Sequence, residues 1–512
     1  MTTSPIDALE LSVLANAVAM IAEEMGAVLV RSALSPNIRE RRDASAAIFD
    51  ARGRMIAQAA HIPVHLGAMP EAVAAVRAHD PRAGDVFILN DPYHGGSHLP
   101  DLTLVQVIAI DDRVSGYAAV RAHHADVGGM SPGSMPQGAT ELVQEGLILP
   151  PVRLVRAGVL DDDLLRVILA NVRTPAERRG DLRAQLAACD AGAQGWVALE
   201  RRLGRERLDA ACDALLDYTE RRIRARLAEM RGQRGRAADR LEGDGVSDAE
   251  IPVVVALSVT DDGLVLDFTG SAPQVAGNVN CPAAVTRAAA VFALRTLVDD
   301  DVPTNDGIAR AITLVLPERS AVNAAWPAAV AAGNVEMSQR IADTILSALG
   351  DAGIAVAAQG QGTMNNVTFG GAGWTFYETL GGGQGASPHA DGPSAVHVGM
   401  SNTLNTPIES LEQSTPLRVE RYELRAGSGG DGRYRGGAGV VRAYRTTVPC
   451  TVTLLTERRR HAPRGVHGGG PGEQGLNLLN GSPLPAKCRV ALQTGDVVTI
   501  ETPGGGGFGA AG

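Results

Sequence analysis

Histidine and carboxylate side chains are concentrated in one short part of the sequence. Seven of the eleven histidines fall between residues 61 and 124, an eighth of the chain, where an even spread would place one or two. Within this part His98 precedes Asp101 by three residues, and His123 precedes Asp126 by three. Two imidazoles with one or two carboxylates form a ligand set for Zn²⁺, Mn²⁺ or Fe²⁺. A cation held with an open coordination position would lower the pKa of a bound water toward neutrality.

The strand pattern around these residues predicts that they meet. The apolar run LTLVQVIAI follows Asp101, the strand-like GYAAV precedes His123, and Asp111 and Asp112 lie between the two runs. We expect an antiparallel hairpin, which brings the ends that carry the two His/Asp pairs to the same edge. Spacing alone leaves a second interpretation open, in which these histidines are ordinary turn or core residues bonded to their neighbours.

The wider pattern indicates a mixed α/β chain. Apolar residues at helical spacing predict a helix over residues 9–32 that ends before Pro36, and further helices are expected over 283–298 and 335–349. We expect a multi-domain fold of four regions: a metal-binding α/β region over 1–160, a helical segment over 161–247, an α/β region over 248–410, and a β-rich, glycine-rich region over 411–512.

Composition excludes several classes of protein. The net charge of −10 argues against a nucleic-acid binder, which would carry a basic stripe interleaved with aromatic residues. Five scattered cysteines without a C-x-x-C pair are typical of free thiols in a reducing compartment. No basic segment opens the chain and no 18-residue apolar run is free of charge, so we expect no signal peptide, no membrane span and a cytoplasmic location.

The only lysine is Lys487, in the segment PLPAKCRV. A G-x-x-x-x-G-K-[ST] phosphate loop is therefore absent, and a Schiff-base mechanism would have to use this one residue. Glycine is abundant, with 60 residues, and is densest in the C-terminal third. These glycines either form tight turns and close backbone contacts, which we favour, or line a nest of amides for a phosphate group.

Several long motifs resemble the hydantoinase B/oxoprolinase family and follow in that family's order over nearly the whole chain. They are SPNIRERRDASAAIFDARGRMIAQAAHIPVHLGAMP (35–70), NDPYHGGSHLPDLTLV (90–105), AHHADVGG (122–129), GNVEMSQRIADTILSALG (333–350), YETLGGGQGASPHADG (377–392), NTLNTPIESLE (402–412), GSGGDGRYRGGAGVVR (427–442) and TPGGGGFG (502–509). The resemblance includes B-type subunits of ATP-dependent hydantoinases and lactamases, with relatives among the acetone carboxylase subunits.

The resemblance implies a metal centre in the histidine-rich region. By motif position its ligands are His98, Asp101 and His123, with Asp43 as a fourth that spacing alone does not reveal. It makes His124 and Asp126 candidates for catalytic proton transfer or for orienting a ligand imidazole. It also leaves His61 and His65 as either neighbours of the site or purely structural residues. Asn334 and Glu336 are placed at a helix start, where capping is the expected role of Asn334.

The resemblance further implies a hydrolase that acts on C–N bonds of cyclic amides and works with a partner. ATP would be bound by a separate actin-like hydantoinase A-type ATPase subunit, which phosphorylates the carbonyl oxygen of a small cyclic amide. A metal-activated water held by this chain would then open the ring. We expect a hetero-oligomer that dimerises further.

Two other functions remain open at this point. A ketone carboxylase subunit, as in acetone and acetophenone carboxylases, would keep the metal and change the reaction. A non-catalytic assembly subunit would hold a structural metal closed by four protein ligands. The sequence does not identify the metal, the cyclic amide or the stoichiometry.

Overall fold

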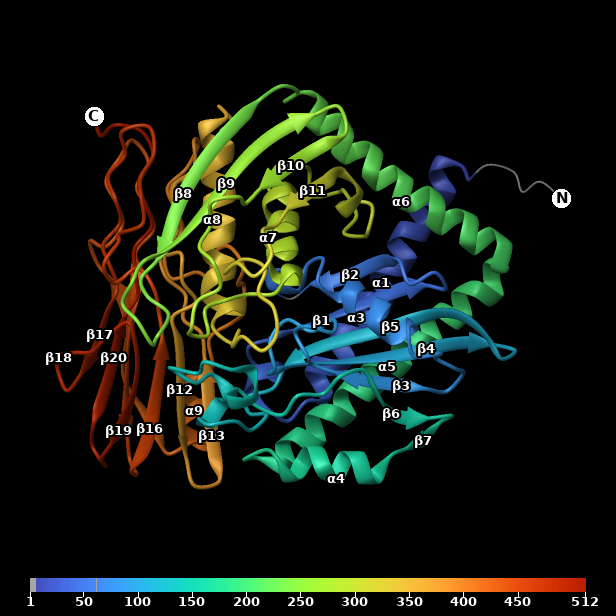
Figure 1. Ribbon diagram of the computed structural model, residues 1–512, viewed down its shortest axis with the longest axis horizontal. Helices are drawn as coiled ribbons and strands as arrows, with labels where there is room; N and C mark the ends of the chain where they lie inside the picture. Colours follow the sequence, from blue (N-terminus) through green and yellow to red (C-terminus); the bar gives the residue numbers. More distant parts are fainter. Residues whose placement is uncertain (1–5, 61) are drawn as a thin grey trace.

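The computed structural model describes residues 6–60 and 62–512, which form several sheets flanked by long helices (Figure 1). The prediction of a mixed α/β fold is confirmed. The N-terminal sheet has seven strands in the order β2-β1-β5-β4-β3-β6-β7. The strands are β1 (Ala44–Asp50), β2 (Met55–Ala60), β3 (Val86–Leu89), β4 (Asp101–Ile110), β5 (Arg113–His123), β6 (Val152–Arg156) and β7 (Val159–Leu160).

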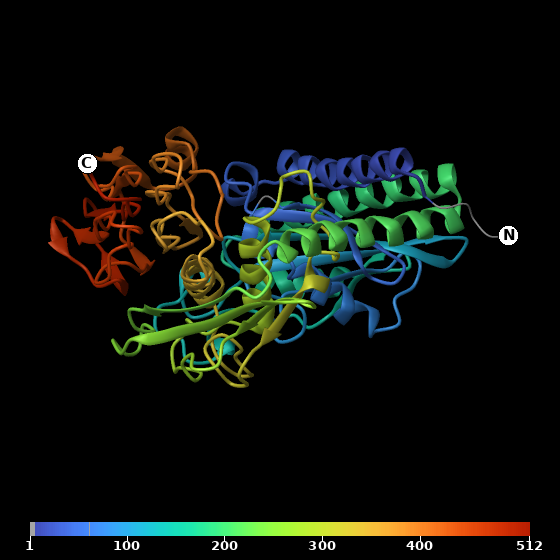
Figure 2. The same ribbon diagram turned by 90° about the horizontal axis from the view of Figure 1, so that it is seen from above.

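Both faces of this sheet are covered. The helices around it are α1 (Ala8–Ser32), α2 (Pro36–Arg39), α3 (Met69–Arg77), α4 (Asp162–Ala170), α5 (Pro175–Leu203) and α6 (Arg205–Ala228). Along β1, Ala46 and Ile48 pack in a core with α1 and α5, while the alternate residues Ala47 and Phe49 pack in a second core with α3. Figure 2 shows the long helices together on one side of the N-terminal strands. Because alternate residues of a strand face opposite sides, a doubly covered strand is apolar throughout.

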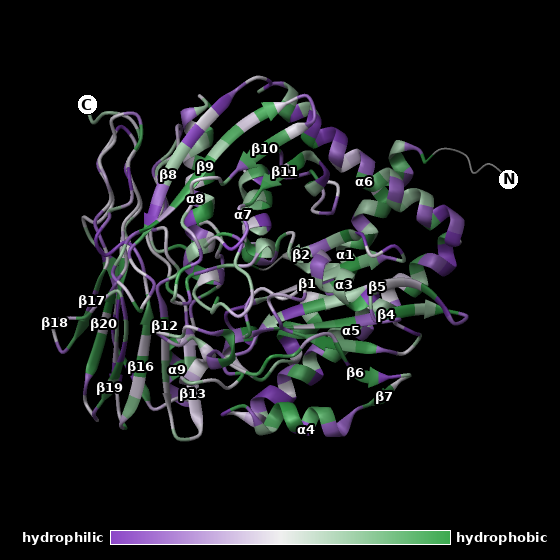
Figure 3. Cartoon of the chain, viewed as in Figure 1, coloured by the Kyte–Doolittle hydropathy of each residue, from purple (hydrophilic) through white to green (hydrophobic). Residues whose placement is uncertain are grey.

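The middle sheet packs on two central helices. Its strands are β8 (Arg234–Leu241), β9 (Ile251–Thr260), β10 (Gly263–Asp267) and β11 (Ile312–Val315), in the order β11-β10-β9-β8. The helices are α7 (Ala283–Arg295) and α8 (Ser338–Asp351). Along β9, Val253, Val255 and Leu257 are buried in the core while the residues between them are more exposed, so this sheet is covered on one face only. Green segments in β9 mark this apolar content (Figure 3).

The C-terminal third is built from two further sheets. One has the order β13-β12-β16-β19 and the other β14-β15-β20-β17-β18. The elements are β12 (Asn366–Gly371), β13 (Trp374–Glu378), α9 (Ile408–Ser414), β14 (Leu417–Arg425), β15 (Gly439–Thr446), β16 (Cys450–Leu455), β17 (Leu476–Leu479), β18 (Ser482–Pro483), β19 (Lys487–Leu492) and β20 (Val497–Glu501). Phe369, Val452 and Tyr444 belong to the core that these two sheets share.

Two details differ from the sequence-based expectation. Residues 234–241 were expected to be helical, but they form strand β8 because they pair along their whole length with β9. Strands also cross two predicted region boundaries: β8 and β9 join across residue 247, and β12 pairs with β16 across residue 410. The division into four domains stays a prediction.

Helix α1 is long and apolar enough to cross a membrane by length and composition alone. Core helices pass the same test, and Leu14, Val18, Met25 and Leu29 of α1 are buried in the core that includes α5. The expectations of no membrane span and of a cytoplasmic location stay predictions.

The glycine-rich run near the C-terminus packs backbone against backbone. A Cβ added to Gly505 would lie 2.0 Å from the carbonyl oxygen of Gln384. The amides of residues 504–507 all donate to backbone carbonyls, including that of Gly437 at 2.9 Å. These glycines therefore allow close packing of chain segments, as favoured from the sequence, and their N–H groups have no free capacity for a phosphate group.

Candidate metal centre

The hairpin predicted from the sequence is confirmed, and it places two of the predicted ligands opposite each other. Strands β4 and β5 pair antiparallel, with Asp101 opposite His123. On the other side of β5 the amide of His123 donates to the carbonyl of Asp43, just before β1, at 3.0 Å. One row across three neighbouring strands therefore holds Asp43, His123 and Asp101.

His98 reaches this row from the loop between β3 and β4. Gly95 in that loop has a φ of 97°, and a Cβ there would lie 2.8 Å from the Cα of Ala72, so the bend requires glycine. The imidazole Nδ1 of His98 lies 3.1 Å from the carbonyl oxygen of Ala331. Because a carbonyl only accepts hydrogen bonds, Nδ1 carries a proton, and Nε2 is left to face Asp101.

Asp101 lies at the centre of the cluster. One oxygen, Oδ1, is 3.0 Å from Nε2 of His98 and 3.2 Å from Nδ1 of His123. The other, Oδ2, accepts a hydrogen bond from the Ser97 hydroxyl at 2.7 Å and lies 3.2 Å from Nε2 of His65. The ligand atoms of His98, Asp101 and His123 all lie within 4.8 Å of one another, and all three residues are buried. The structure thus brings three of the four predicted ligands together.

The charges of these groups depend on each other. Burial opposes ionisation of Asp101, but the charges of His98 and His65 hold its pKa well below the usual range. Burial also disfavours the charged form of His98, yet the neighbouring Asp101 carboxylate raises its pKa. Burial lowers the pKa of His123. The cluster therefore combines an ionised Asp101 with one imidazole, His98, whose protonated form that charge favours, and another, His123, whose neutral form burial favours.

The residues present fit a divalent cation. Nε2 of His98 and Oδ1 of Asp101 are both acceptors at 3.0 Å, a contact that is repulsive unless a proton or cation lies near both. Nε2 of His123 is also buried and has no hydrogen-bond partner among the described residues. Buried polar atoms are rarely left unpaired in folded proteins, so such atoms on two imidazoles indicate a site for a cation. Two imidazoles and a carboxylate suit Zn²⁺, Mn²⁺ or Fe²⁺.

Asp43 lies next to the cluster without belonging to the group of three. It is buried, and its carboxylate lies 3.9 Å from the guanidinium Nη2 of Arg41. Its negative charge acts to raise the pKa of both His98 and His123. Its role as a fourth ligand stays a prediction.

His124 and Asp126 contact other parts of the protein. Nε2 of His124 lies 2.9 Å from the side-chain oxygen of Gln185 on α5, and burial lowers its pKa to about 4. Asp126 accepts a hydrogen bond from the Gly133 amide at 3.0 Å and pairs with the Arg173 guanidinium at 2.9 Å. These contacts hold the chain that follows β5, and the predicted proton transfer by either residue stays a prediction.

Other residues complete the surroundings of the cluster. His65, left open from the sequence, contacts Asp101 directly, whereas His61 lies outside the described residues. Asn334 lies in a one-turn π-helix, Gly333–Met337, and its side-chain amide is 3.4 Å from Oδ2 of Asp101. The expectation that Asn334 caps a helix is wrong, since Ala332 is the N-cap and the side-chain oxygen of Asn334 has no hydrogen-bond partner among the described residues. π-Helical turns are frequent at functional sites, but no sequence pattern marks this one.

An aromatic ring from the C-terminal region packs against the cluster. The ring of Tyr377 on β13 stacks on His123 with centroids 4.5 Å apart and an interplanar angle of 17°. Its hydroxyl donates to the side-chain oxygen of Asn366 at 2.8 Å, and Asn366 in turn donates to Glu336 at 2.9 Å. Burial and the negative charge of Glu457 raise the pKa of Glu336 to about 7. Sequence analysis had no signal for Tyr377, which lies far from the histidines along the chain.

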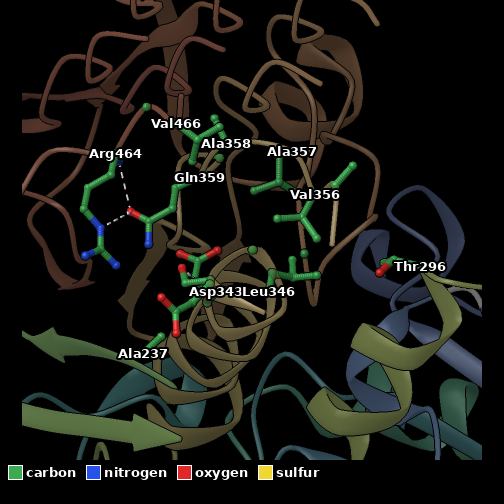
Figure 4. Close-up of a pocket in the computed structure, with 18 of the residues that line it drawn as sticks. Ala237, Thr296, Asp343, Leu346, Val356, Ala357, Ala358, Gln359, Arg464 and Val466 are labelled. Carbon is green, nitrogen blue, oxygen red and sulfur yellow. Dashed lines mark hydrogen bonds between the residues drawn. The ribbon is translucent and has the colours of Figure 1, made fainter. Parts of the chain in front are cut away.

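A large cavity lies elsewhere in the described part of the chain. It has a volume of about 770 Å³ and lies between α8 and loops of the C-terminal region (Figure 4). Arg464 and Gln359 are hydrogen-bonded on its wall, and Leu346 of α8 also lines it. None of the three clustered ligands is among its lining residues.

Comparison with known proteins identifies sequence relatives of this chain. The hydantoinase B/oxoprolinase family matches residues 7–511. An uncharacterized protein of Methanocaldococcus jannaschii is 41% identical, with 99% of this chain and 91% of that protein covered. The 5-oxoprolinase of Dictyostelium discoideum is 36% identical over 99% of this chain, which spans only 41% of that longer protein.

Solved structures show the same fold. An ATP-dependent caprolactamase from Pseudomonas jessenii superposes with a TM-score of 0.89 at 27% identity, covering 99% of this chain and 92% of that one. An acetone carboxylase superposes with a TM-score of 0.86 at 18% identity, covering 98% and 75%, which shows a shared fold. The motifs, the fold and the match over nearly the whole length agree, and the chain belongs to the hydantoinase B/oxoprolinase family.

Proposed function

We propose that this chain is the metal-dependent subunit of an ATP-dependent enzyme that hydrolyses cyclic amides. The observation that carries the proposal is the buried group of His98, Asp101 and His123, in which Nε2 of His123 has no hydrogen-bond partner among the described residues and Nε2 of His98 faces the Asp101 carboxylate. The likeness to a caprolactamase and to 5-oxoprolinases supports the substrate class. The chemistry of the group supports the metal.

Each residue of the cluster has a distinct task in this proposal. His98, Asp101 and His123 hold the divalent cation, with Asp43 as a fourth ligand. The bound cation would supply Lewis acidity and lower the pKa of a coordinated water. Ser97 and His65 fix the orientation of Asp101 by contacts to its Oδ2. His124 and Asp126 are kept as candidates for proton transfer, although their described contacts lie outside the cluster.

In this proposal a partner subunit binds and uses the ATP. An amide carbonyl resists attack because its nitrogen donates electron density, and phosphorylation of the carbonyl oxygen removes that resonance. A hydantoinase A-type subunit with an actin-like ATPase fold would carry out this step, and the two subunits would form a hetero-oligomer that dimerises. The extra length of the 5-oxoprolinases, of which this chain spans about two fifths, agrees with a second functional part.

The test uses the chain reconstituted with its partner subunit. His98→Ala and Asp101→Ala should bind less than one tenth of the zinc that the wild type binds and lose ATP-dependent ring opening. His94→Ala is the matched control, because His94 lies in the same loop with its side chain largely exposed. Near wild-type ring opening by both cluster variants would refute the assignment.

Ketone carboxylation is the second candidate, favoured by the fold shared with acetone carboxylase. It predicts bicarbonate-dependent consumption of acetone, whereas lactam hydrolysis needs no bicarbonate. A non-catalytic assembly role predicts that chelation leaves the activity of the complex unchanged. Assays of lactam and acetone turnover with and without chelator separate the three.

A further inference from the structure

Glu145 is a buried carboxylate to which the proposed function gives no role. It follows a short 3-10 turn, Leu142–Gln144, and its side chain is fully buried. In the described part of the chain, no arginine, lysine or histidine nitrogen lies within 4.0 Å of it. An ionised carboxylate without a cationic partner is costly to bury, and burial accordingly raises the pKa of Glu145 to about 8, so hydrogen bonds rather than an ion pair hold this group in place.

Its partners are two consecutive backbone amides. Oε1 accepts from Val330 at 3.0 Å and from Ala331 at 2.8 Å, and Oε2 accepts from Val330 at 3.1 Å. The carbonyl of Ala331 is the group that accepts the Nδ1 proton of His98 at 3.1 Å. One peptide segment therefore links the carboxylate to the candidate metal ligand, with Glu145 bound to its N–H side and His98 to its C=O side.

The surrounding backbone keeps this segment in place. The amide of Leu142 donates to the carbonyl of Pro327 at 2.9 Å, so the two loops run side by side. A Cβ added to Gly333 would lie 1.8 Å from the carbonyl oxygen of Asn280, so the chain is also held closely on its other side. Among these contacts, Glu145 is the one side chain that binds the amides of Val330 and Ala331.

We propose that Glu145 is a positioning residue that fixes the ring orientation and the tautomer of His98. By accepting from the amides of Val330 and Ala331, Glu145 fixes the backbone segment that carries the carbonyl of Ala331. The carbonyl of Ala331 then keeps the proton on Nδ1 and directs Nε2 toward Asp101. Partners of this kind behind a ligand histidine typically change metal affinity 10- to 100-fold when they are removed. The inference rests on the proposed metal-dependent function.

The first test measures zinc affinity of the full chain by competition with a chromophoric chelator. Glu145→Leu, which removes both acceptor oxygens from the two amides at similar size, should weaken zinc binding 10- to 100-fold while circular dichroism stays that of the wild type. Glu200→Leu is the matched control, because Glu200 is a buried glutamate on α5 that bonds Ser115 instead. It should keep zinc affinity within twofold.

A second measurement is independent of metal. Nitrogen-15 NMR of the metal-free, histidine-labelled chain, at a pH high enough for His98 to be neutral, should show His98 as the Nδ1–H tautomer in the wild type and a mixture of tautomers in Glu145→Leu. If the wild type binds no zinc, manganese or iron, the proposed function fails while this measurement still decides the role of Glu145.

The outcome that overturns the inference is a folded Glu145→Leu chain with wild-type zinc affinity and an unchanged His98 tautomer. Should that variant not fold, Glu145→Asp supplies the same comparison, because the shorter side chain keeps the carboxyl group and withdraws it from the amides. Wild-type behaviour of Glu145→Asp in both measurements would then overturn the inference.

Discussion

Two buried polar clusters in this protein differ in the groups that neutralise their carboxylates. Around α8, Asp239 and Asp343 both pair with Arg458, at 3.0 and 2.7 Å. In the same cluster Glu457 pairs with Lys487 and lies 3.4 Å from Arg340. The protein itself therefore supplies the cationic side chains that pair with these carboxylates, and we call this group the closed cluster.

In the candidate metal centre the carboxylate of Asp101 faces three imidazoles. An imidazole can stay neutral and then presents a lone pair, whereas a guanidinium has no acceptor. The same degree of burial thus gives a structural cluster in one region and a candidate binding site in the other. The only lysine in the sequence, Lys487, belongs to the closed cluster.

The largest expected effect is on the closed cluster. Lys487→Met leaves the buried Glu457 with one cationic partner fewer and should lower the free energy of unfolding by about 3–5 kcal/mol, while zinc affinity stays unchanged. Urea denaturation measures it, and Arg421→Met, which breaks an exposed ion pair with Glu423, is the control. A loss below about 1 kcal/mol would remove the contrast between the clusters.

The candidate metal centre should respond to metal instead. Zinc at about 100 times its Kd should raise the free energy of unfolding by about 2.7 kcal/mol, because only the folded chain presents the assembled ligands. The same addition should do nothing for His98→Ala. Thermal melts with zinc and with chelator measure both, and an equal shift in the two proteins would contradict the assignment.

The pH dependence of stability should report Glu336, which adjoins both clusters. Its pKa of about 7 in the folded chain lies above the usual 4.5, so between these values the folded state keeps a proton that the unfolded chain releases. The free energy of unfolding should therefore fall as pH rises from 4.5 to 7, by up to about 1.4 kcal/mol per pH unit.

Glu336→Gln should remove this part of the slope in metal-free protein, as measured by denaturation at a series of pH values. Exposed Glu229→Gln controls for the loss of one carboxylate. An unchanged slope in Glu336→Gln would show that this group does not titrate in that window.

The smallest expected effect is on the aromatic wall of the metal centre. Tyr377→Leu removes the stack on His123, worth about 1 kcal/mol, and should weaken zinc binding about fivefold. Tyr377→Phe keeps the ring, loses only the hydrogen bond to Asn366, and should bind zinc like the wild type. Equal affinities for the two variants would mean that the stack does not position His123.

Sequence patterns predicted the parts of the molecule that depend on local interactions. The hairpin of β4 and β5 follows from two apolar runs and a turn, and helices α1, α7 and α8 follow from helical spacing. Strand β8 was missed because its strand conformation comes from pairing with β9. The structural role of the C-terminal glycines was favoured from the sequence, and the observed backbone contacts agree with it.

The sequence by itself determined which side chains can bind a metal and that Asp101 and His123 meet, because residue type, strand alternation and a turn are local properties. Only the tertiary structure decided what surrounds them. Ala331 lies 233 residues from His98, and Asn334 lies 233 residues from Asp101. Contacts over such separations arise when whole elements pack against one another. No local pattern contains that information, so the partners that orient the candidate ligands appear only in the folded chain.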